Sequence, residues 1–237
     1  MDVSPDPAGP SQPLPALNFD ANGLVPVIVQ DHLTGEIRMF AYATEAAVRK
    51  TLETGKATFW SRSRAELWEK GRTSGNVIRV LRVLVDCDAD CVVYSSEPHG
   101  NSCHTGAQSC FFREVDEANG TNGANGREWV ACRSGQALLP TLEAVLEARK
   151  ASTAKASYTK SLYESGSPAI GKKIREEAGE LADAIDAESD DRVVSEAADV
   201  LYHLVVGLRW RGVTVRRVLG ELARRFGKSG HEEKASR

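Results

Sequence analysis

Three things are scarce in this sequence of 237 residues: cysteine, excess positive charge and long apolar runs. Cysteine occurs five times, an odd number, and no secretory signal is visible, so reduced thiols are predicted rather than a disulfide framework. Lys and Arg total 30 against 33 Asp and Glu, so nothing in the net charge of -3 predicts nucleic-acid binding. No apolar run approaches the roughly 18 residues of a membrane span, so no membrane partner is expected.

The amino-terminal residues 1–18 contain neither Lys nor Arg and are rich in proline. This composition fits neither a secretory signal nor a transit peptide. The sequence therefore predicts a disordered lead-in before the first domain.

Residues 19–115 are predicted to form a β-rich domain. Apolar residues 24–30 and residues 35–42 flank a turn-like sequence, which indicates a hairpin. A helix is then expected, because Thr44 can cap its start and Gly55 can end it. Further strands are predicted over residues 57–60, 77–86, 91–95 and 110–115.

Residues 116–137 are predicted to be a linker, because three Asn-Gly pairs favour turns. After them, apolar residues recur at spacings of three and four, which is the helical pattern. Four such stripes lie over residues 139–146, 170–185, 193–208 and 218–226. The sequence thus predicts an α+β protein with two domains, a β-rich one over 19–115 and an all-α one over 138–237.

Asp86, Asp88 and Asp90 alternate along a predicted strand, where alternate side chains share one face. Three carboxylates on one face repel one another unless a cation lies among them, and hard oxygen ligands suit Mg²⁺. With Glu97 they also match the spacing of an EF-hand calcium loop. However, Cys91 stands where that loop needs glycine, and the flanking residues are strand-like, so a magnesium site is favoured.

The same region is rich in thiols, which prefer Zn²⁺. Cys103 and Cys110 flank a loop that contains glycine and could reach one ion, with Cys87 as a third ligand from the face opposite the aspartates. Three protein ligands leave a fourth position for water, the layout of a catalytic zinc. His104 is placed to move protons. Ordinary buried thiols remain an alternative at this point.

Three motifs of the first domain resemble phosphoribosyl-AMP cyclohydrolase of histidine biosynthesis: FWSRSRAELWEKGRTSGN over 59–76, VDCDADC over 85–91 and SCHTGAQSCFF over 102–112. The resemblance implies a homodimer whose zinc ligands come from both subunits. It assigns Mg²⁺ to the three aspartates of residues 86–90 and leaves Cys91 outside the ligand set. The zinc ligands that it implies are Cys87, Cys103 and Cys110. It further implies hydrolytic opening of the adenine ring between N1 and C6, with His104 shuttling protons.

A polar and basic segment precedes the aspartates, and by the resemblance it binds the phosphates and riboses of the substrate. A solvated surface is the plainer interpretation of such a segment, and Trp60 is as compatible with the core as with base stacking. The candidate binding residues are Trp60, Ser61, Arg62, Ser63, Arg64, Lys70, Thr73, Ser74 and Asn76.

Two pairs of acidic residues stand out in the second domain. Glu177 and Glu180 are three residues apart on one predicted helix, and Glu196 and Asp199 are three apart on the next. Antiparallel helices could gather all four carboxylates around Mg²⁺. A charged solvent face is the usual alternative, but Asp199 lies close to an apolar stripe and like charges at this spacing are destabilising unless neutralised.

These pairs, with SYTKSL over 157–162 and ADVLYHL over 198–204, resemble phosphoribosyl-ATP pyrophosphohydrolase. The resemblance implies that the four carboxylates hold Mg²⁺ on the triphosphate, that Glu177 or Glu180 activates water, and that pyrophosphate is released. Lys173, Lys234 and Arg237 are candidate phosphate contacts, with a solvated role as the alternative. His203, on an apolar helix face, is predicted to be structural.

Both resemblances together predict a bifunctional enzyme that acts on phosphoribosyl-ATP and then on phosphoribosyl-AMP. The alternatives are a metal-stabilised binding module and a chain with one active domain. A cytoplasmic location is expected, or the plastid stroma if a transit peptide precedes this sequence.

Overall fold

A computed structural model describes residues 16–115, 129–131, 137–151 and 158–226 of the chain. The chain divides into two compact units, residues 1–136 and residues 137–237. None of the helices in the described ranges is long and apolar enough to span a membrane.

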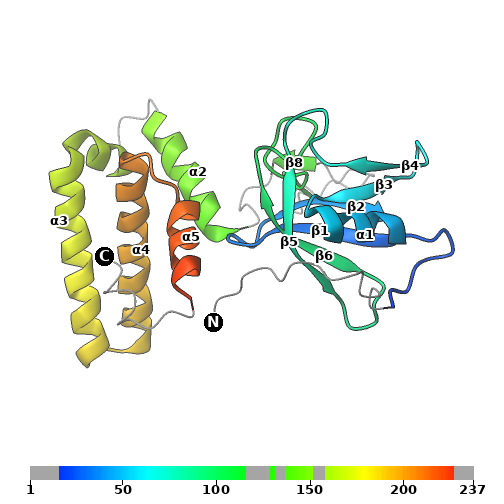
Figure 1. Ribbon diagram of the computed structural model, residues 1–237. Helices are drawn as coiled ribbons and strands as arrows, with labels where there is room; N and C mark the ends of the chain where they lie inside the picture. The colour runs from blue at the N-terminus through cyan, green and yellow to red at the C-terminus, as the bar shows by residue number, and fades with distance from the viewer. Residues whose placement is uncertain (1–15, 116–128, 132–136, 152–157, 227–237) are drawn as a thin grey trace, which may run out of the picture. The chain divides into compact units, whose positions relative to one another are not determined.

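The first unit is built on a six-stranded sheet with the order β4-β3-β2-β1-β6-β5 (Figure 1). β1 and β6 run parallel, and the other neighbours are antiparallel. The strands are β1 (Val25–Asp31), β2 (Ile37–Ala43), β3 (Thr58–Ser61), β4 (Glu66–Glu69), β5 (Ile78–Val85) and β6 (Val92–Pro98). A separate pair consists of β7 (Arg113–Val115) and β8 (Trp129–Ala131).

The alternating burial of β1 builds the core of this unit. Val25, Val27 and Val29 are fully buried, and they pack with Phe59 and Tyr94 from β3 and β6. Burial of such apolar side chains is the main favourable contribution to folding. The hairpin predicted from the first two apolar runs is confirmed as β1 and β2.

One helix, α1 (Glu45–Thr54), belongs to the sheet unit. Thr44 caps it by accepting a hydrogen bond from the Ala47 backbone N–H, and Gly55 ends it in the left-handed conformation. Both the predicted cap and the predicted end are therefore confirmed.

Two segments differ from their predicted structure. Residues 66–69, predicted only as part of a polar segment, form β4 and pair with β3. Within the predicted linker, residues 129–131 form β8, while 116–128 and 132–136 lie outside the described residues. Of the predicted lead-in, residues 1–15 lie outside them too, and residues 16–18 are described. The domain boundaries predicted from the sequence stay predictions.

The second unit is helical, as its apolar stripes predicted. Its helices are α2 (Leu138–Ala151), α3 (Tyr158–Ala187), α4 (Asp190–Trp210) and α5 (Val215–Arg225). α3 and α4 lie side by side along most of their length (Figure 1). The core contains Leu146, Ile170 and Val205, from α2, α3 and α4. α3 is kinked at Gly166, two residues before Pro168. The straight part of the helix after this kink therefore contains the apolar stripe predicted over residues 170–185.

Candidate active sites

The three aspartates of the first unit lie on a turn rather than on a strand. β5 ends at Val85 and β6 begins at Val92, so the predicted alternation along an extended strand is wrong for residues 86–90. The turn is closed by the Cys91 backbone N–H, which donates to Oδ1 of Asp86 over 3.0 Å. Ala89 has a φ of 61°, a left-handed conformation that few non-glycine residues adopt.

The turn nevertheless gathers the aspartates. Asp86, Asp88 and Asp90 each offer a carboxylate oxygen, and these oxygens lie within 4.8 Å of one another. The negative charge of Asp88, followed by partial desolvation, raises the pKa of Asp90 above its ordinary value. All three side chains are exposed. A hard divalent cation would relieve this repulsion, so the donor set fits Mg²⁺.

Asn18 connects the chain before β1 to this turn. Its backbone N–H donates to the Ala89 carbonyl oxygen over 2.7 Å, and its side-chain amide donates to the Asp88 carbonyl. Sequence reasoning placed this residue in the lead-in and missed it, because no local pattern links residue 18 to residues 88 and 89. Its two bonds hold the strained part of the turn in place.

Two of the three predicted zinc thiols are neighbours. The thiols of Cys103 and Cys110 are close enough for each to shift the pKa of the other. The Thr105 hydroxyl donates to Sγ of Cys103 over 3.1 Å and is the main cause that lowers the Cys103 pKa. Burial, followed by the charge of Cys103, raises the pKa of Cys110 to about 11. Adjacent thiols with such opposed shifts form a soft donor pair that a cation would stabilise.

Cys87 does not join this pair within one chain. It is exposed on the aspartate turn, where its thiol contacts a carboxylate oxygen of Asp88 at 3.8 Å. In the described part of the chain, two clusters of three possible metal ligands occur, and both consist of carboxylates without a cysteine. A single chain therefore brings together two of the three predicted zinc ligands.

His104 and Lys70 stand next to the thiol pair. His104 is exposed, with Nδ1 3.9 Å from Sγ of Cys103. Lys70 follows β4 directly, and burial lowers its pKa while Cys110 and Cys103 act in the opposite direction. A cation beside two thiols favours the charged, metal-binding form of sulfur.

The other predicted substrate-binding residues lie on the β3–β4 hairpin and on the turn after β4. Trp60 is half-buried on β3. The guanidinium of Arg62 lies 4.1 Å from the centre of the Tyr42 ring, and Arg64 pairs with Glu66. Ser63, Thr73 and Ser74 are exposed, Ser61 and Asn76 are half-buried, and the Ser74 hydroxyl accepts from the Asn76 backbone N–H.

In the helical unit, a carboxylate from α3 meets two from α4. Glu177, Glu196 and Asp199 each place an oxygen within 4.8 Å of the others. Glu177 and Glu196 are buried, and Asp199 is exposed. Buried carboxylates this close are costly without neutralising charges, which argues against a merely solvated acidic face.

Two basic side chains supply part of that charge. Lys173 reaches Oε1 of Glu177 at 2.8 Å and Glu176 at 3.0 Å, and these hydrogen bonds raise the Lys173 pKa. Arg192 pairs with Glu196 one helical turn away. Sequence reasoning missed Arg192, although its i, i+4 spacing to Glu196 was a signal that could have found it.

Glu180 lies beside this trio. Its pKa is raised, first by desolvation and then by the charges of Glu177 and Glu196. Its side chain also contacts Glu196. The structure thus places all four predicted carboxylates in one region, with Glu180 at its exposed edge. Lys234 and Arg237 lie outside the described residues.

His203 is buried next to the trio. Its Nδ1 lies 2.9 Å from the Asp199 carbonyl oxygen, which can only accept, so in the neutral ring Nδ1 carries the hydrogen. Nε2 then accepts from the Tyr158 hydroxyl over 2.9 Å. These bonds fix the ring 3.7 Å from Oε1 of Glu177. Tyr158, given no role from the sequence, thereby links the start of α3 to α4.

Known proteins match both units. The family model of phosphoribosyl-AMP cyclohydrolase matches residues 39–112, and that of phosphoribosyl-ATP pyrophosphohydrolase matches residues 139–226. The histidine biosynthesis bifunctional protein HisIE of Wolinella succinogenes is 38% identical over 94% of this chain and 97% of its own length. The protein of the same name from Aquifex aeolicus is 41% identical over 89% of this chain and 98% of its own.

The chain belongs to the HisIE family. It is a bifunctional hydrolase of histidine biosynthesis, with a cyclohydrolase domain followed by a pyrophosphohydrolase domain. The HisIE protein of Deinococcus radiodurans is 42% identical over 92% of this chain and 95% of its own length. The aspartate turn and the thiols lie within the residues that the cyclohydrolase model matches, and the acidic trio lies within those that the pyrophosphohydrolase model matches.

Proposed function

We propose that each reaction uses the residues described above, and that the helical unit acts first. It converts phosphoribosyl-ATP to phosphoribosyl-AMP and pyrophosphate. The sheet unit then opens the adenine ring of phosphoribosyl-AMP. The observation that carries this proposal is that each unit gathers metal-binding groups: carboxylates between α3 and α4 in the helical unit, and a thiol pair and an aspartate turn in the sheet unit.

In the helical unit, Glu177, Glu196 and Asp199 would hold Mg²⁺, because their oxygens are close together and two of them are buried. When bound there, the ion would neutralise charge on the triphosphate and help to orient it. Lys173, which pairs with Glu177 at 2.8 Å, is a cationic side chain beside these carboxylates that can turn to a phosphate. Its ammonium group can leave the Glu177 carboxylate and bind a phosphate oxygen instead, and it stays protonated in both cases.

Glu180 is the proposed base of this step. It stands outside the closest trio, at its exposed edge and in contact with Glu196, so its carboxylate is left to accept a proton from water while the trio holds the ion. The water oxygen attacks the α-phosphorus and forms the new P–O bond; one water proton passes to Glu180, and the other stays on the new phosphate hydroxyl. Pyrophosphate leaves with the electrons of the broken P–O bond, so one water is consumed.

In the sheet unit, thiolates of Cys103 and Cys110 suit Zn²⁺, and the three aspartates suit Mg²⁺. Zinc supplies water of lowered pKa for attack. His104, exposed beside Cys103, takes a proton from the water that adds to C6 and returns one to N1 as the N1–C6 bond breaks. The β3–β4 hairpin and the turn after it, including Arg62 and Lys70, bind the substrate phosphates and riboses.

We also propose a homodimer in which Cys87 of a second copy completes the thiol site. Within one chain the Cys103–Cys110 pair lacks this third thiol, while Cys87 is exposed. Large apolar side chains exposed on the same unit, such as Phe40, support an interface of this kind.

Mixing of inactive variants tests the dimer. Cys87→Ala and Cys103→Ala proteins are each expected to lack cyclohydrolase activity. After subunit exchange, half of the dimers are mixed, and each mixed dimer has one complete thiol site. Recovery of about a quarter of the wild-type activity, the fraction that random pairing of symmetric dimers predicts, supports a shared site. Recovery of none, with exchange verified, contradicts it.

A cytoplasmic location is proposed from the bacterial relatives. Fractionation of the native source, with the enzyme followed by antibody, tests this location. Recovery of the protein from plastids would contradict it.

Product analysis tests the proposed activities. Phosphoribosyl-ATP is supplied with Mg²⁺ and Zn²⁺ to the wild type, to Cys103→Ala and to Glu177→Gln. The wild type is expected to yield the ring-opened ribotide, Cys103→Ala to stop at phosphoribosyl-AMP, and Glu177→Gln to leave the substrate unchanged. Accumulation of ring-opened product by Cys103→Ala would contradict the role of the thiols.

A further inference from the structure

The loop that carries Cys103 and Cys110, residues 99–112, contains no helix or strand. Its tip is closed by its own backbone: Ser102 N–H donates to the Gln108 carbonyl over 3.1 Å, and Cys103 N–H donates to the Ala107 carbonyl over 3.1 Å. These bonds shape the tip, but they do not attach it to the sheet. The separation of the two thiols therefore depends on what anchors the two ends of the loop.

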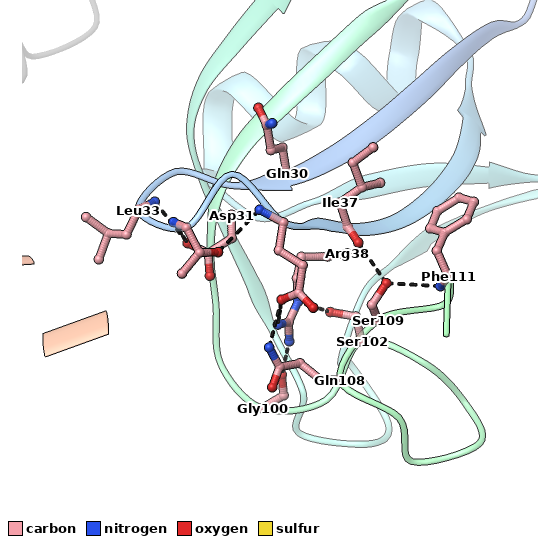
Figure 2. A network of polar contacts seen from close by, with 12 residues as sticks. Gln30, Asp31, Leu33, Ile37, Arg38, Gly100, Ser102, Gln108, Ser109 and Phe111 are labelled. Carbon is pink, nitrogen blue, oxygen red and sulfur yellow. Dashed lines mark hydrogen bonds and ion pairs between the residues drawn. The ribbon is translucent and has the colours of Figure 1, made fainter. Parts of the chain in front are cut away.

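Arg38 on β2 anchors the first end. Its side chain is almost fully buried, with 4% of the residue exposed. Nη2 donates to the Gly100 carbonyl oxygen over 2.9 Å, and Nε donates to the Ser102 hydroxyl over 3.2 Å. Figure 2 shows the guanidinium directed into this loop. The planar fork thus holds the loop at two positions just before Cys103.

The backbone of the same residue anchors the second end. The Cys110 N–H donates to the Arg38 carbonyl oxygen over 2.9 Å. The preceding residue, Ser109, donates its hydroxyl to the Ile37 carbonyl oxygen over 2.7 Å (Figure 2). Both ends of the loop are therefore bound to the same short stretch of β2.

A buried guanidinium is stable only with an anionic partner. Glu36 provides it, since its Oε2 lies 2.7 Å from Nη1 of Arg38. The same oxygen accepts a hydrogen bond from the side-chain amide of Gln108 over 2.7 Å. Glu36 thus connects the arginine to a third position in the loop, between the two cysteines.

From this arrangement we infer that Arg38 is a positioning residue of the cyclohydrolase site, which sets the separation of the Cys103 and Cys110 thiols by binding both ends of their loop. The inference rests on the proposed role of these thiols as metal ligands. Arg38 itself is directed at carbonyl and hydroxyl oxygens of the loop and not at either sulfur. Groups that orient metal ligands in this way typically change metal affinity by roughly 10- to 100-fold when they are removed.

The test is Co²⁺ binding to the metal-free, full-length protein, followed by the thiolate-to-cobalt absorption and the ligand-field bands. Arg38→Met is expected to raise the Co²⁺ dissociation constant by roughly 10- to 100-fold and to alter the ligand-field bands. Arg38→Lys keeps the charge beside Glu36 but cannot bind Gly100 and Ser102 together, so an intermediate constant is expected. Arg79→Met is the matched control, because Arg79 is an exposed arginine of β5 paired only loosely, at 3.5 Å, with Glu97.

Two further measurements separate the possible failures. Cys103→Ala shows whether the cobalt bands arise from the thiols, and if this variant keeps them, the proposed metal site is wrong. If it loses them while Arg38→Met and Arg38→Lys bind Co²⁺ as the wild type does, the metal site stands and the positioning role is refuted. Pyrophosphate release by each variant reports on the helical unit. Should Arg38→Met fail to fold, as judged by circular dichroism, Arg38→Lys decides the question.

Discussion

Replacement of Glu177 by glutamine is predicted to leave the helical unit folded but to remove its stabilisation by Mg²⁺. The oxygens of Glu177 and Glu196 lie within 4.8 Å, which gives a repulsion of about 3.5 kcal/mol or more at an effective dielectric constant of about 20. Asp199 adds further repulsion, reduced by its exposure. The ion pair of Glu177 with Lys173 at 2.8 Å contributes about 6 kcal/mol of the opposite sign. Because these contributions nearly cancel, the unfolding free energy without metal should change little.

Magnesium is expected to change this balance in the wild type. At a Mg²⁺ concentration of about 100 times the dissociation constant, binding stabilises the folded state by about 2.7 kcal/mol. For a unit of this size, that corresponds to a rise in melting temperature of roughly 10 °C or more. Glu177→Gln removes one of three ligands and should lose most of this rise.

The assay is thermal unfolding of the full-length protein by circular dichroism, with and without MgCl₂. Glu176→Gln is the matched control, because Glu176 adjoins Glu177 and also pairs with Lys173 but lies outside the trio. The control should keep the magnesium-dependent rise. An equal rise in Glu177→Gln and the wild type would refute the assignment of the trio as the metal site.

Three other predictions follow from single contacts. Gly71→Ala should destabilise the sheet unit by about 2–4 kcal/mol in chemical denaturation, because φ is 87° and an added Cβ would lie 2.5 Å from the Val77 backbone nitrogen. The control is Gly75→Ala, where φ is 75° but the space is open, so the expected loss of stability is only about 1–2 kcal/mol. Equal losses in the two variants would contradict the steric argument. Asn18→Ala should weaken Mg²⁺ binding at the aspartate turn in calorimetric titration, and unchanged affinity would show that the turn holds its shape alone. The pKa of Glu180 is raised, so this carboxyl binds more protons in the folded state than in the unfolded state; without metal, the helical unit should therefore lose stability as pH rises from about 4.5 through the folded-state pKa. Thermal melts across this pH range should show that Glu180→Gln lacks this pH-dependent loss of stability. The same pH profile in Glu180→Gln and the wild type would contradict the prediction.

Helical positions could be predicted from the sequence because their apolar residues repeat at three and four. The α1 cap was equally readable, since Thr44 and Gly55 act through local backbone geometry. The carboxylates on α3 and α4 were found for the same reason, as residues three apart on a helix share a face wherever the helix packs.

The sheet unit was harder to predict where single residues adopt unusual backbone conformations. Ala65, with φ 50°, turns the chain between β3 and β4, and Ala89, with φ 61°, shapes the aspartate turn. Alanine gives no sign of a left-handed conformation, so β4 was missed and the aspartates were assigned to a strand. Their convergence comes from the turn instead of from strand alternation.

Long-range contacts account for the remaining misses. Arg38 is a charged residue within a strand and would normally be assigned to a solvent-facing position. Its burial depends on Gly100 and Ser102, more than sixty residues later in the chain. Asn18 is likewise defined by partners seventy residues away, so neither role could be found from local spacing.

The proposed function places two consecutive hydrolyses at two sites, one for each unit of the chain. A mixture of Glu177→Gln protein, expected to lack pyrophosphohydrolase activity, with Cys103→Ala protein, expected to lack cyclohydrolase activity, tests this division. Supplied with phosphoribosyl-ATP, the mixture should accumulate phosphoribosyl-AMP transiently and then convert it fully to the ring-opened ribotide, although neither variant does so alone. Failure of the mixture to form that product, with both variants folded, would contradict the assignment of the two activities to these two sites.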